Sequence, residues 1–466
     1  MALLIKNGEI VTAEERYRAD IWCEGETITR IGADLSAPPD SDSADCQVID
    51  AQGKLVFPGF IDPHVHIYLP FMGTFAKDTY DTASRAALVG GTTTLIEMVC
   101  PSRADDPWES YELWKSQAAG RSACDYAFHM GVTRFDERTP DLLRRIVADG
   151  TASFKVFLAY KGAFGIDDAE LYNTLALARR LGVIVTAHCE NAELVAQLQQ
   201  RLLSEGKTGP EWHEPSRPPM VEAAGVQHLA TFARATDAHV YVVHTSSDDA
   251  LSVARRARQE GARLWVETVV PYLVLDRTFA ERSDFEGAKY VMSPPLREPR
   301  HQQALWNALV AGEIDTVATD HAPFDFRKQK EMGRDDFTKI PNGIPSVEER
   351  VRLLYTHGVV PGRIDLHRFV DVASTKAARL FGLFPHKGTI QTGADADLVI
   401  FDPAYRGTIS AKTQQMNVDY SAFEGWPIQG RADMVTVRGR IQVRDGKFIG
   451  SNEHGRMLRR DPTHGA

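Results

Sequence analysis

The sequence predicts an α/β protein, a (β/α)8 TIM barrel with a discontinuous small β-sandwich domain formed by the N- and C-terminal segments. Two observations predict this fold. Between residues 56 and 382, short apolar runs alternate with longer segments of helical periodicity, a pattern typical of β-α units around a parallel sheet. On either side, residues 1–55 and 383–466 show short strands separated by turns.

Eight apolar runs are the candidate strands of the barrel. They cover residues 55–61, 92–99, 126–132, 153–158, 183–187, 239–244, 264–270 and 316–319. Predicted helices between them include residues 140–148, 169–181, 221–235 and 248–259. Eight strands that each lead into a helix are the number that closes a barrel of this type.

The two flanking segments are expected to form one β domain. The N-terminal segment has candidate strands at residues 3–6, 9–12 and 21–24, followed by a polar stretch at 37–45 rich in Pro, Ser and Asp. The C-terminal segment has candidate strands at residues 397–401, 433–438 and 440–443. We expect strands of the second segment to pair with those of the first.

Composition narrows the classes of function. The chain has 466 residues, a hydrophobic fraction of 43% and a net charge of -10, so it resembles an ordinary globular protein and lacks the excess of basic residues typical of nucleic-acid binding. No apolar stretch is long enough for a spanning helix and the first residues lack a signal-peptide pattern, so we expect a cytoplasmic protein without a membrane partner. The five cysteines are widely spread, and we expect reduced thiols.

Polar residues of metal-binding type occur in or after five of the eight runs. They are His64 and His66 after the first run, Lys155 inside the fourth, His188 after the fifth, His244 at the end of the sixth and Asp320 after the eighth. In barrels of this kind the carboxyl ends of the strands carry the active site. Four histidines and a carboxylate suit zinc or a similar cation.

For His64, His66 and Lys155, explanations other than metal binding are also open. His64 and His66 are alternate residues, so both rings can reach one ion, although a lone pair of this kind also occurs by chance on surfaces. Lys155 lies in the apolar run 153–158, where an unpaired ammonium would be costly to bury. It therefore needs a modified charge or, alternatively, a salt bridge across the barrel.

The motifs resemble a known family. The sequence Phe57-Pro-Gly-Phe-Ile-Asp-Pro-His-Val-His66, the residues Lys155, His188 and His244, and the run Thr319-Asp-His-Ala-Pro323 are similar to those of the amidohydrolase superfamily, in its dihydropyrimidinase and D-hydantoinase group. The resemblance covers nearly the whole chain. It includes Glu267-Thr268, Met292-Ser-Pro-Pro-Leu-Arg297, Pro341-Asn-Gly-Ile-Pro345 and Gly393-Ala-Asp-Ala-Asp-Leu398.

This resemblance implies a binuclear metal centre, with two divalent ions, expected to be Zn²⁺, in each subunit. CO₂ would carboxylate Lys155, and the resulting carbamate would bridge the ions. His64, His66 and Asp320 would hold the first ion, and His188 and His244 the second. A hydroxide between the ions would attack the ring amide of a hydantoin or dihydropyrimidine, giving an N-carbamoyl amino acid. The group also implies a homo-oligomer, a tetramer or dimer.

Further residues receive roles from the same resemblance. Asp320 would carry the proton from the attacking water to the leaving nitrogen. Tyr160 would donate a hydrogen bond to the developing oxyanion, although an ordinary loop tyrosine is the alternative. Backbone groups at Ser293 and Asn342 would hold the imide or ureido edge of the ring. Independently of the resemblance, Glu190 lies two residues after His188 and is expected to orient its ring.

Apolar residues flank the predicted ligands and favour an apolar substituent pocket. They are Leu69, Phe71, Phe157 and Phe164, with loop packing as the alternative interpretation, above all for Phe157. Dihydroorotases typically carry an arginine two residues after the H-x-H motif, and allantoinases a Glu-Pro-Gly-Arg-like run, whereas here Ile67, Tyr68 and Leu69 follow. Pro271 departs from the glutamine usual in the group, which leaves an allantoinase-type or other cyclic ureide hydrolase as an alternative.

A second alternative belongs to a different class of function. Some relatives of dihydropyrimidinase are non-catalytic cytoskeletal scaffold proteins that have lost metal ligands. Because all six candidate ligands are present here, the sequence favours an enzyme.

Overall fold

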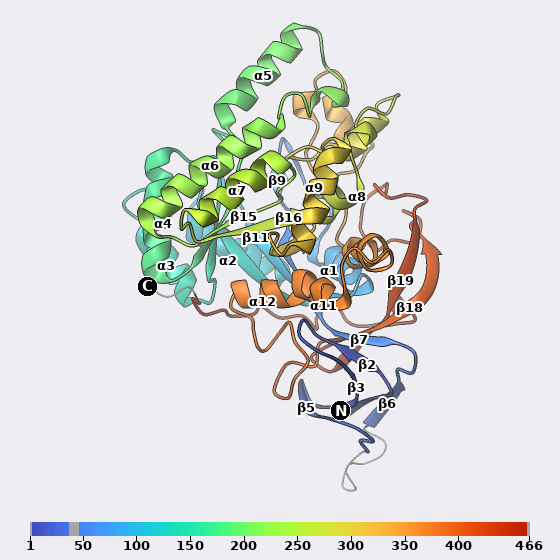
Figure 1. Ribbon diagram of the computed structural model, residues 1–466. Helices are drawn as coiled ribbons and strands as arrows, with labels where there is room; N and C mark the ends of the chain where they lie inside the picture. Colours follow the sequence, from blue (N-terminus) through green and yellow to red (C-terminus); the bar gives the residue numbers. More distant parts are fainter. Residues whose placement is uncertain (1, 37–45, 464–466) are drawn as a thin grey trace.

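A barrel of eight parallel strands forms the centre of the molecule, which we describe for residues 2–36 and 46–463 in a computed structural model (Figure 1). The polar stretch at 37–45 lies outside these residues. The strands follow one another around the sheet in chain order. They are β8 (Phe60–Val65), β11 (Thr92–Val99), β12 (Asp125–Gly131), β13 (Ser153–Phe157), β14 (Ile184–His188), β15 (Val240–Val242), β16 (Leu264–Val269) and β17 (Thr316–Ala318). The predicted barrel is confirmed.

The first predicted strand needs a correction, because residues 55–61 are not one strand. The strand β7 (Leu55–Pro58) pairs antiparallel with β18 (Leu398–Thr408) in the sandwich, and the barrel begins only with β8. The break falls at Gly59, where an added Cβ would lie 2.0 Å from Oγ1 of Thr93. A side chain at this position would therefore collide with the neighbouring barrel strand, and the apolar pattern alone did not reveal the change of sheet.

The barrel closes between its last and first strands. The backbone N–H of Asp320 donates to the carbonyl of His64 at 3.0 Å, and the N–H of His66 donates to the carbonyl of His321 at 2.8 Å. Below them, the carboxylate of Asp62 accepts a hydrogen bond from the Thr319 hydroxyl at 2.6 Å. The residues that close the barrel are therefore the predicted ligands and their immediate neighbours.

Helices between the strands, and others after the last strand, surround the barrel (Figure 1). They are α1 (Tyr80–Val89), α2 (Pro107–Ala118), α3 (Thr139–Ala148), α4 (Asp168–Leu181), α5 (Ala192–Ser204), α6 (Pro219–Thr236), α7 (Asp248–Gln259), α8 (Val270–Val274), α9 (Pro299–Val310), α10 (Arg350–Leu354), α11 (Leu366–Val370) and α12 (Lys376–Leu380). In α4, Asp167 and Glu170 form a capping box, and Gly182 ends the helix with φ 66°. Among the described residues, no helix is long and apolar enough to span a membrane.

Strands from both ends of the chain share the sandwich, as Figure 1 shows in blue and orange-red. One sheet has the order β5-β4-β1-β6 and the other β21-β20-β19-β18-β7-β2-β3. Their bounds are β1 (Ala2–Lys6), β2 (Glu9–Val11), β3 (Arg16–Arg18), β4 (Asp20–Glu24), β5 (Thr27–Gly32), β6 (Cys46–Asp50), β19 (Pro427–Val437), β20 (Arg440–Arg444) and β21 (Lys447–Phe448). Buried Ile5, Ile21, Val56 and Leu398 pack between the sheets, so the expected pairing of the two segments is present.

Candidate metal centre

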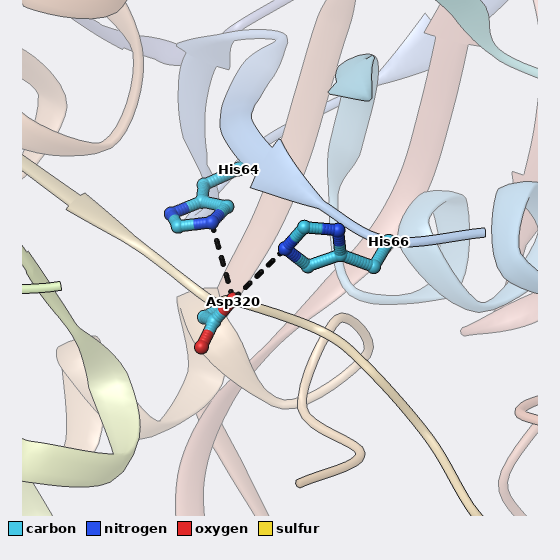
Figure 2. Close-up of side chains that lie close together, drawn as sticks. All are labelled: His64, His66 and Asp320. Atoms are coloured by element: carbon cyan, nitrogen blue, oxygen red, sulfur yellow. Dashed lines mark ion pairs between the residues drawn. The ribbon is translucent and has the colours of Figure 1, made fainter. Parts of the chain in front are cut away.

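Three predicted ligands meet where the barrel closes. His64 lies in β8, His66 follows that strand, and Asp320 follows β17 (Figure 2). Oδ1 of Asp320 lies 3.1 Å from Nε2 of His64 and 3.3 Å from Nε2 of His66. The two rings present the same type of nitrogen to one carboxylate oxygen. This group is therefore a compact set of two imidazoles and one carboxylate, suited to a divalent cation.

A second pair of predicted ligands, His188 and His244, lies beside the first set. Nδ1 of His188 lies 2.9 Å from Nε2 of His244, and the ring centroids of His244 and His64 are 5.4 Å apart. On its other side, Nε2 of His188 lies 2.8 Å from Oε2 of Glu190, which agrees with the expectation that Glu190 orients this ring. Arg217 in turn donates to Glu190. Fixing one ring nitrogen in this way leaves Nδ1 of His188 directed toward the other histidine.

Lys155 is buried in β13 without a counter-ion. Its side chain is 0% exposed, and Nζ makes no hydrogen bond to any described residue. Burial lowers the pKa of Lys155, although the carboxylate of Asp320 partly opposes this shift. The structure therefore does not contain the alternative, a salt bridge across the barrel, within the part of the chain that it describes. The ring of Phe157, whose centroid lies 4.8 Å from Nζ, is the group that faces the amine, which forms neither a hydrogen bond nor an ion pair with a described residue.

Glu267 supports the centre and has a role that the sequence did not reveal. Its Oε1 lies 2.7 Å from Nδ1 of His64 and accepts the backbone N–H of His244 at 2.9 Å. Its Oε2 accepts the hydroxyl of Tyr241 at 2.8 Å. One carboxylate thus sets the position of residues from both ligand pairs. The Glu267-Thr268 motif was noted in the sequence, but only the fold shows which groups it touches.

Three site residues have a left-handed backbone, which is uncommon for residues other than glycine. Asp320 has φ 51°, His244 has φ 39° and Tyr160 has φ 58°. Such conformations cost of the order of 1–3 kcal/mol each and persist where the surroundings enforce them. All three residues follow barrel strands, so the turn that ends each strand also aims its side chain into the site.

Electrostatics favours the protonation states that metal ligands need at Asp320 and His66, whereas at His64 the carboxylates of Glu267 and Asp320 outweigh burial and raise the pKa of the ring. Burial opposes ionisation of Asp320, but the neighbouring His64 and His66 rings outweigh it and hold the pKa of Asp320 well below its usual range. Burial lowers the pKa of His66 to about 4. At neutral pH the carboxylate is therefore ionised and the His66 imidazole is neutral, the forms in which these side chains bind metals.

A pocket opens directly above the ligands. Its lining includes five of the six predicted ligands, all except His64, and every predicted substrate contact. The lining residues are His66, Leu69, Phe71, Lys155, Phe157, Tyr160, Phe164, His188, His244, Ser293, Asp320, Ala322 and Asn342. Phe71 stacks on Phe164 with a centroid distance of 6.0 Å, and the amide of Asn342 donates to the Ser293 hydroxyl at 3.0 Å. One wall is therefore aromatic and apolar, and another is polar.

Comparisons with known proteins agree with this geometry. Residues 55–442 match the amidohydrolase family. The chain belongs to that family. It is 45% identical to a D-hydantoinase from Geobacillus stearothermophilus, over 99% of this chain and 97% of the relative. It is 37% identical to a rat (Rattus norvegicus) dihydropyrimidinase, over 99% of this chain and 89% of the relative.

Solved structures place this member of the amidohydrolase family in the hydantoinase and dihydropyrimidinase group. A D-hydantoinase (dihydropyrimidinase) from Thermus sp. superimposes with a TM-score of 0.97 at 64% identity, covering 99% of this chain and 100% of the other. An L-hydantoinase from Arthrobacter aurescens superimposes with a TM-score of 0.87 at 30% identity, covering 98% and 99%. The predicted family, fold and enzyme class are confirmed.

A second cluster of carboxylates in this amidohydrolase contains its own cation. Asp125, Asp395 and Asp397 lie together near the amino end of β12, but Nζ of Lys387 lies 2.7, 2.9 and 2.7 Å from them. Arg438 also pairs with Asp125. The three carboxylates outweigh burial and raise the pKa of Lys387. Because an ammonium fills the cluster, these residues join the sandwich to the barrel and do not form a further metal site.

Proposed function

We propose that this chain opens the ring of cyclic amides and imides, namely hydantoins and 5,6-dihydropyrimidines, by hydrolysis to N-carbamoyl amino acids. The observation that carries the proposal is the meeting of four histidines, Asp320 and the unpartnered Lys155 beneath a pocket with one apolar and one polar wall. Relatives with 37% to 45% identity over nearly the full chain are named D-hydantoinase or dihydropyrimidinase. Both names describe hydrolysis of such rings.

The residues present fit two divalent ions, for which we propose Zn²⁺. His64, His66 and Asp320 would hold one ion, and His188 and His244 the other. Lys155 would contribute to both after carboxylation, which removes the problem of a buried amine without a partner. When bound, the ions supply Lewis-acid polarisation of the ring carbonyl and an activated water.

Asp320 is proposed to move the proton. Its low pKa keeps it ionised, so it can accept the proton of the attacking water and return it to the ring nitrogen as the C–N bond breaks. The hydroxyl of Tyr160, held 3.5 Å from the Asn342 amide, lines the same pocket and would donate to the oxyanion. Ser293 and Asn342 would hold the imide edge of the ring from the polar wall.

Substrate preference is proposed to follow from the apolar wall. Leu69, Phe157 and Phe164 are all less than 10% exposed, and Phe71 packs on Phe164. No Arg or Lys lies between His66 and Ala76. A substrate carboxylate would therefore lose its hydration without gaining a cation, so we expect dihydroorotate to be excluded and hydrocarbon substituents to be accepted.

The proposal also covers the oligomeric state and the domain division of the protein. We propose a homo-oligomer, a tetramer or dimer. We also propose a division into a β-sandwich of residues 1–55 and 383–466 and a catalytic barrel of residues 56–382.

The deciding experiment is an assay of zinc-loaded protein with dihydrouracil and hydantoin, with dihydroorotate and allantoin as comparison substrates. Ring opening of the first two, about two ions per chain by elemental analysis and loss of activity on chelation would support the proposal. Efficient hydrolysis of allantoin alone would support the allantoinase alternative. Metal-loaded protein inactive on every ring would support the scaffold alternative.

A further inference from the structure

Lys330 is a buried lysine that none of the roles above uses. It begins the short 3-10 helix η4 (Lys330–Gly333) in the segment that follows β17, and its side chain is 0% exposed. Its Nζ donates to the carbonyls of Val291 at 2.9 Å and Gly343 at 2.8 Å. Both described partners are neutral, and burial lowers the pKa of Lys330 well below its ordinary value. Lysines are seldom buried in this way without a carboxylate.

The two carbonyls belong to the segments that form the polar wall of the pocket. Val291 lies two residues before Ser293, and Gly343 directly follows Asn342. The N–H of Gly343 also donates to the Val291 carbonyl at 2.9 Å, and the Asn342 amide donates to the Ser293 hydroxyl at 3.0 Å. The segments that contain Val291 and Gly343 are thus hydrogen-bonded to each other, and Lys330, from a third segment, donates a hydrogen bond to each of them.

Close packing allows these segments little movement. Gly343 has φ 155°, and an added Cβ would lie 2.1 Å from the Ala322 carbonyl oxygen. A Cβ on Gly333, at the end of η4, would lie 2.3 Å from Cγ1 of Ile340. Removing the Lys330 amine leaves the Val291 and Gly343 carbonyls unpaired, which favours a displacement of these backbones, and in such close packing even a small displacement would alter the spacing of Ser293 and Asn342.

The cost of burying an amine distinguishes a positioning role for Lys330 from simple packing. Val291 packs with apolar Leu202, Phe337 and Ile340, so an apolar side chain would suit this region without the cost of burying an amine. What the amine adds is two directed hydrogen bonds to the backbone on which Ser293 and Asn342 stand. Removing the donor of such hydrogen bonds leaves buried carbonyls unpaired, which is costly.

We propose that Lys330 is a positioning residue for substrate: its amine ties the Val291–Ser293 segment to the Asn342–Gly343 segment and sets the spacing of the groups that hold the imide edge of the ring. This inference rests on the function proposed above. It assigns to Lys330 an effect on binding of the ring, because the residue acts on the polar wall and not on the ligands of the metal centre.

The test is Lys330→Met in the zinc-loaded full chain, with hydantoin and dihydrouracil as substrates. Met keeps an unbranched side chain of similar length and removes both donors. We expect KM to rise about tenfold or more, which corresponds to about 1.4 kcal/mol of lost binding, while kcat changes by less than about threefold. Zinc content should equal that of the unmutated chain. Lys289→Met is the matched control, because it removes a lysine from the adjacent segment whose partner is the side chain of Glu286, and its KM should not change.

Three results would overturn the inference. One is a KM for Lys330→Met within twofold of that of the active unmutated chain. Another is a parallel fall of kcat, zinc content and thermal midpoint, which would indicate general structural damage. If Lys330→Met does not fold, Lys330→Leu, which also lacks a donor and suits the apolar neighbours Leu202, Phe337 and Ile340, takes its place, and an unchanged KM there would also reject the role. An unmutated chain that opens no ring contradicts the proposed function itself, so the two failures are distinguishable.

Discussion

Asp320 contacts His64 twice: its backbone N–H donates to the His64 carbonyl at 3.0 Å, and its carboxylate lies 3.1 Å from the His64 ring. The first contact closes the barrel, and the second forms part of the candidate metal centre (Figure 2). The spacing of these two ligands is therefore set by closure of the barrel and not by a flexible loop. This arrangement lets the side chain of Asp320 be altered while the backbone contact remains.

We expect Asp320→Asn to fold normally and to lose activity by at least about a hundredfold, or roughly 2.7 kcal/mol of barrier. An amide can occupy the position of the carboxylate, but it cannot accept and return the proton. Circular dichroism measures the fold, elemental analysis the zinc content, and a dihydrouracil assay kcat. Asp335→Asn is the control, because Asp335 is an exposed carboxylate in the same segment after β17. Activity of Asp320→Asn within about tenfold of the unmutated chain would show that another group moves the proton.

Lys155→Ala is expected to abolish ring opening and to lower the zinc content. The substitution removes the buried amine that carboxylation would turn into a shared ligand. A crystal structure of the unmutated, zinc-loaded protein should show side-chain density at Lys155 longer than lysine by one carboxylate. Lys207→Ala serves as a control, because Lys207 pairs with Glu205 at the surface. An unmodified lysine in active, metal-loaded crystals would contradict the carboxylation.

Shortening the apolar wall should change which ring substituents are preferred. In Leu69→Ala and Phe71→Ala, kcat/KM for hydantoins with bulky hydrocarbon substituents should change more than kcat/KM for unsubstituted dihydrouracil. The reason is that these side chains line the apolar wall, where the ring substituent is proposed to lie. A difference of about 1–3 kcal/mol between substrates, or roughly 10- to 200-fold, is the range expected for hydrophobic contacts. Equal effects on all substrates would show that the ring substituent does not lie against Leu69 and Phe71.

Glu97 should make the stability of the protein depend on pH. This carboxyl in β11 accepts the backbone N–H of Ile67 at 2.8 Å and the indole N–H of Trp114 at 3.2 Å, and burial raises its pKa well above the usual range. Between the unfolded and folded pKa values the folded chain binds more protons at Glu97 than the unfolded chain does. The contribution of Glu97 to stability therefore falls as pH rises through this window.

The comparison variant is Glu97→Gln, which has no proton to lose. Thermal midpoints measured at one scan rate between pH 5 and pH 8 should fall more steeply for the unmutated chain than for Glu97→Gln. The thermal midpoint of Glu97→Gln minus that of the unmutated chain should thus increase with pH. Parallel pH profiles for the two proteins would show that Glu97 does not titrate in this range.

Much of the fold and of the site could be predicted from local pattern. The alternation of apolar runs with helical segments located seven of the eight barrel strands and the start of the first, β8, and β11 begins and ends at the predicted residues 92 and 99. Because the carboxyl ends of parallel strands meet at one face, the positions of His188 and His244 after their strands were enough to place them together. The predicted ligands and substrate contacts then line one pocket or lie at its base.

Other features depend on contacts between distant segments, and only the tertiary structure decided them. The run 55–61 contains the pair Pro58-Gly59 but no polar residue, and only the fold showed that the chain changes sheet at Gly59, where Thr93 of the next strand leaves no room for a side chain. Glu267 touches His64 across 203 positions of sequence, and Lys330 reaches Val291 across 39. The sequence by itself thus determined where most strands end and which types of residue stand at those ends, because the periodicity that marks a strand is a local property. The partners of buried charges were decided by packing, because each buried donor or acceptor takes whatever group the folded chain brings within hydrogen-bond distance.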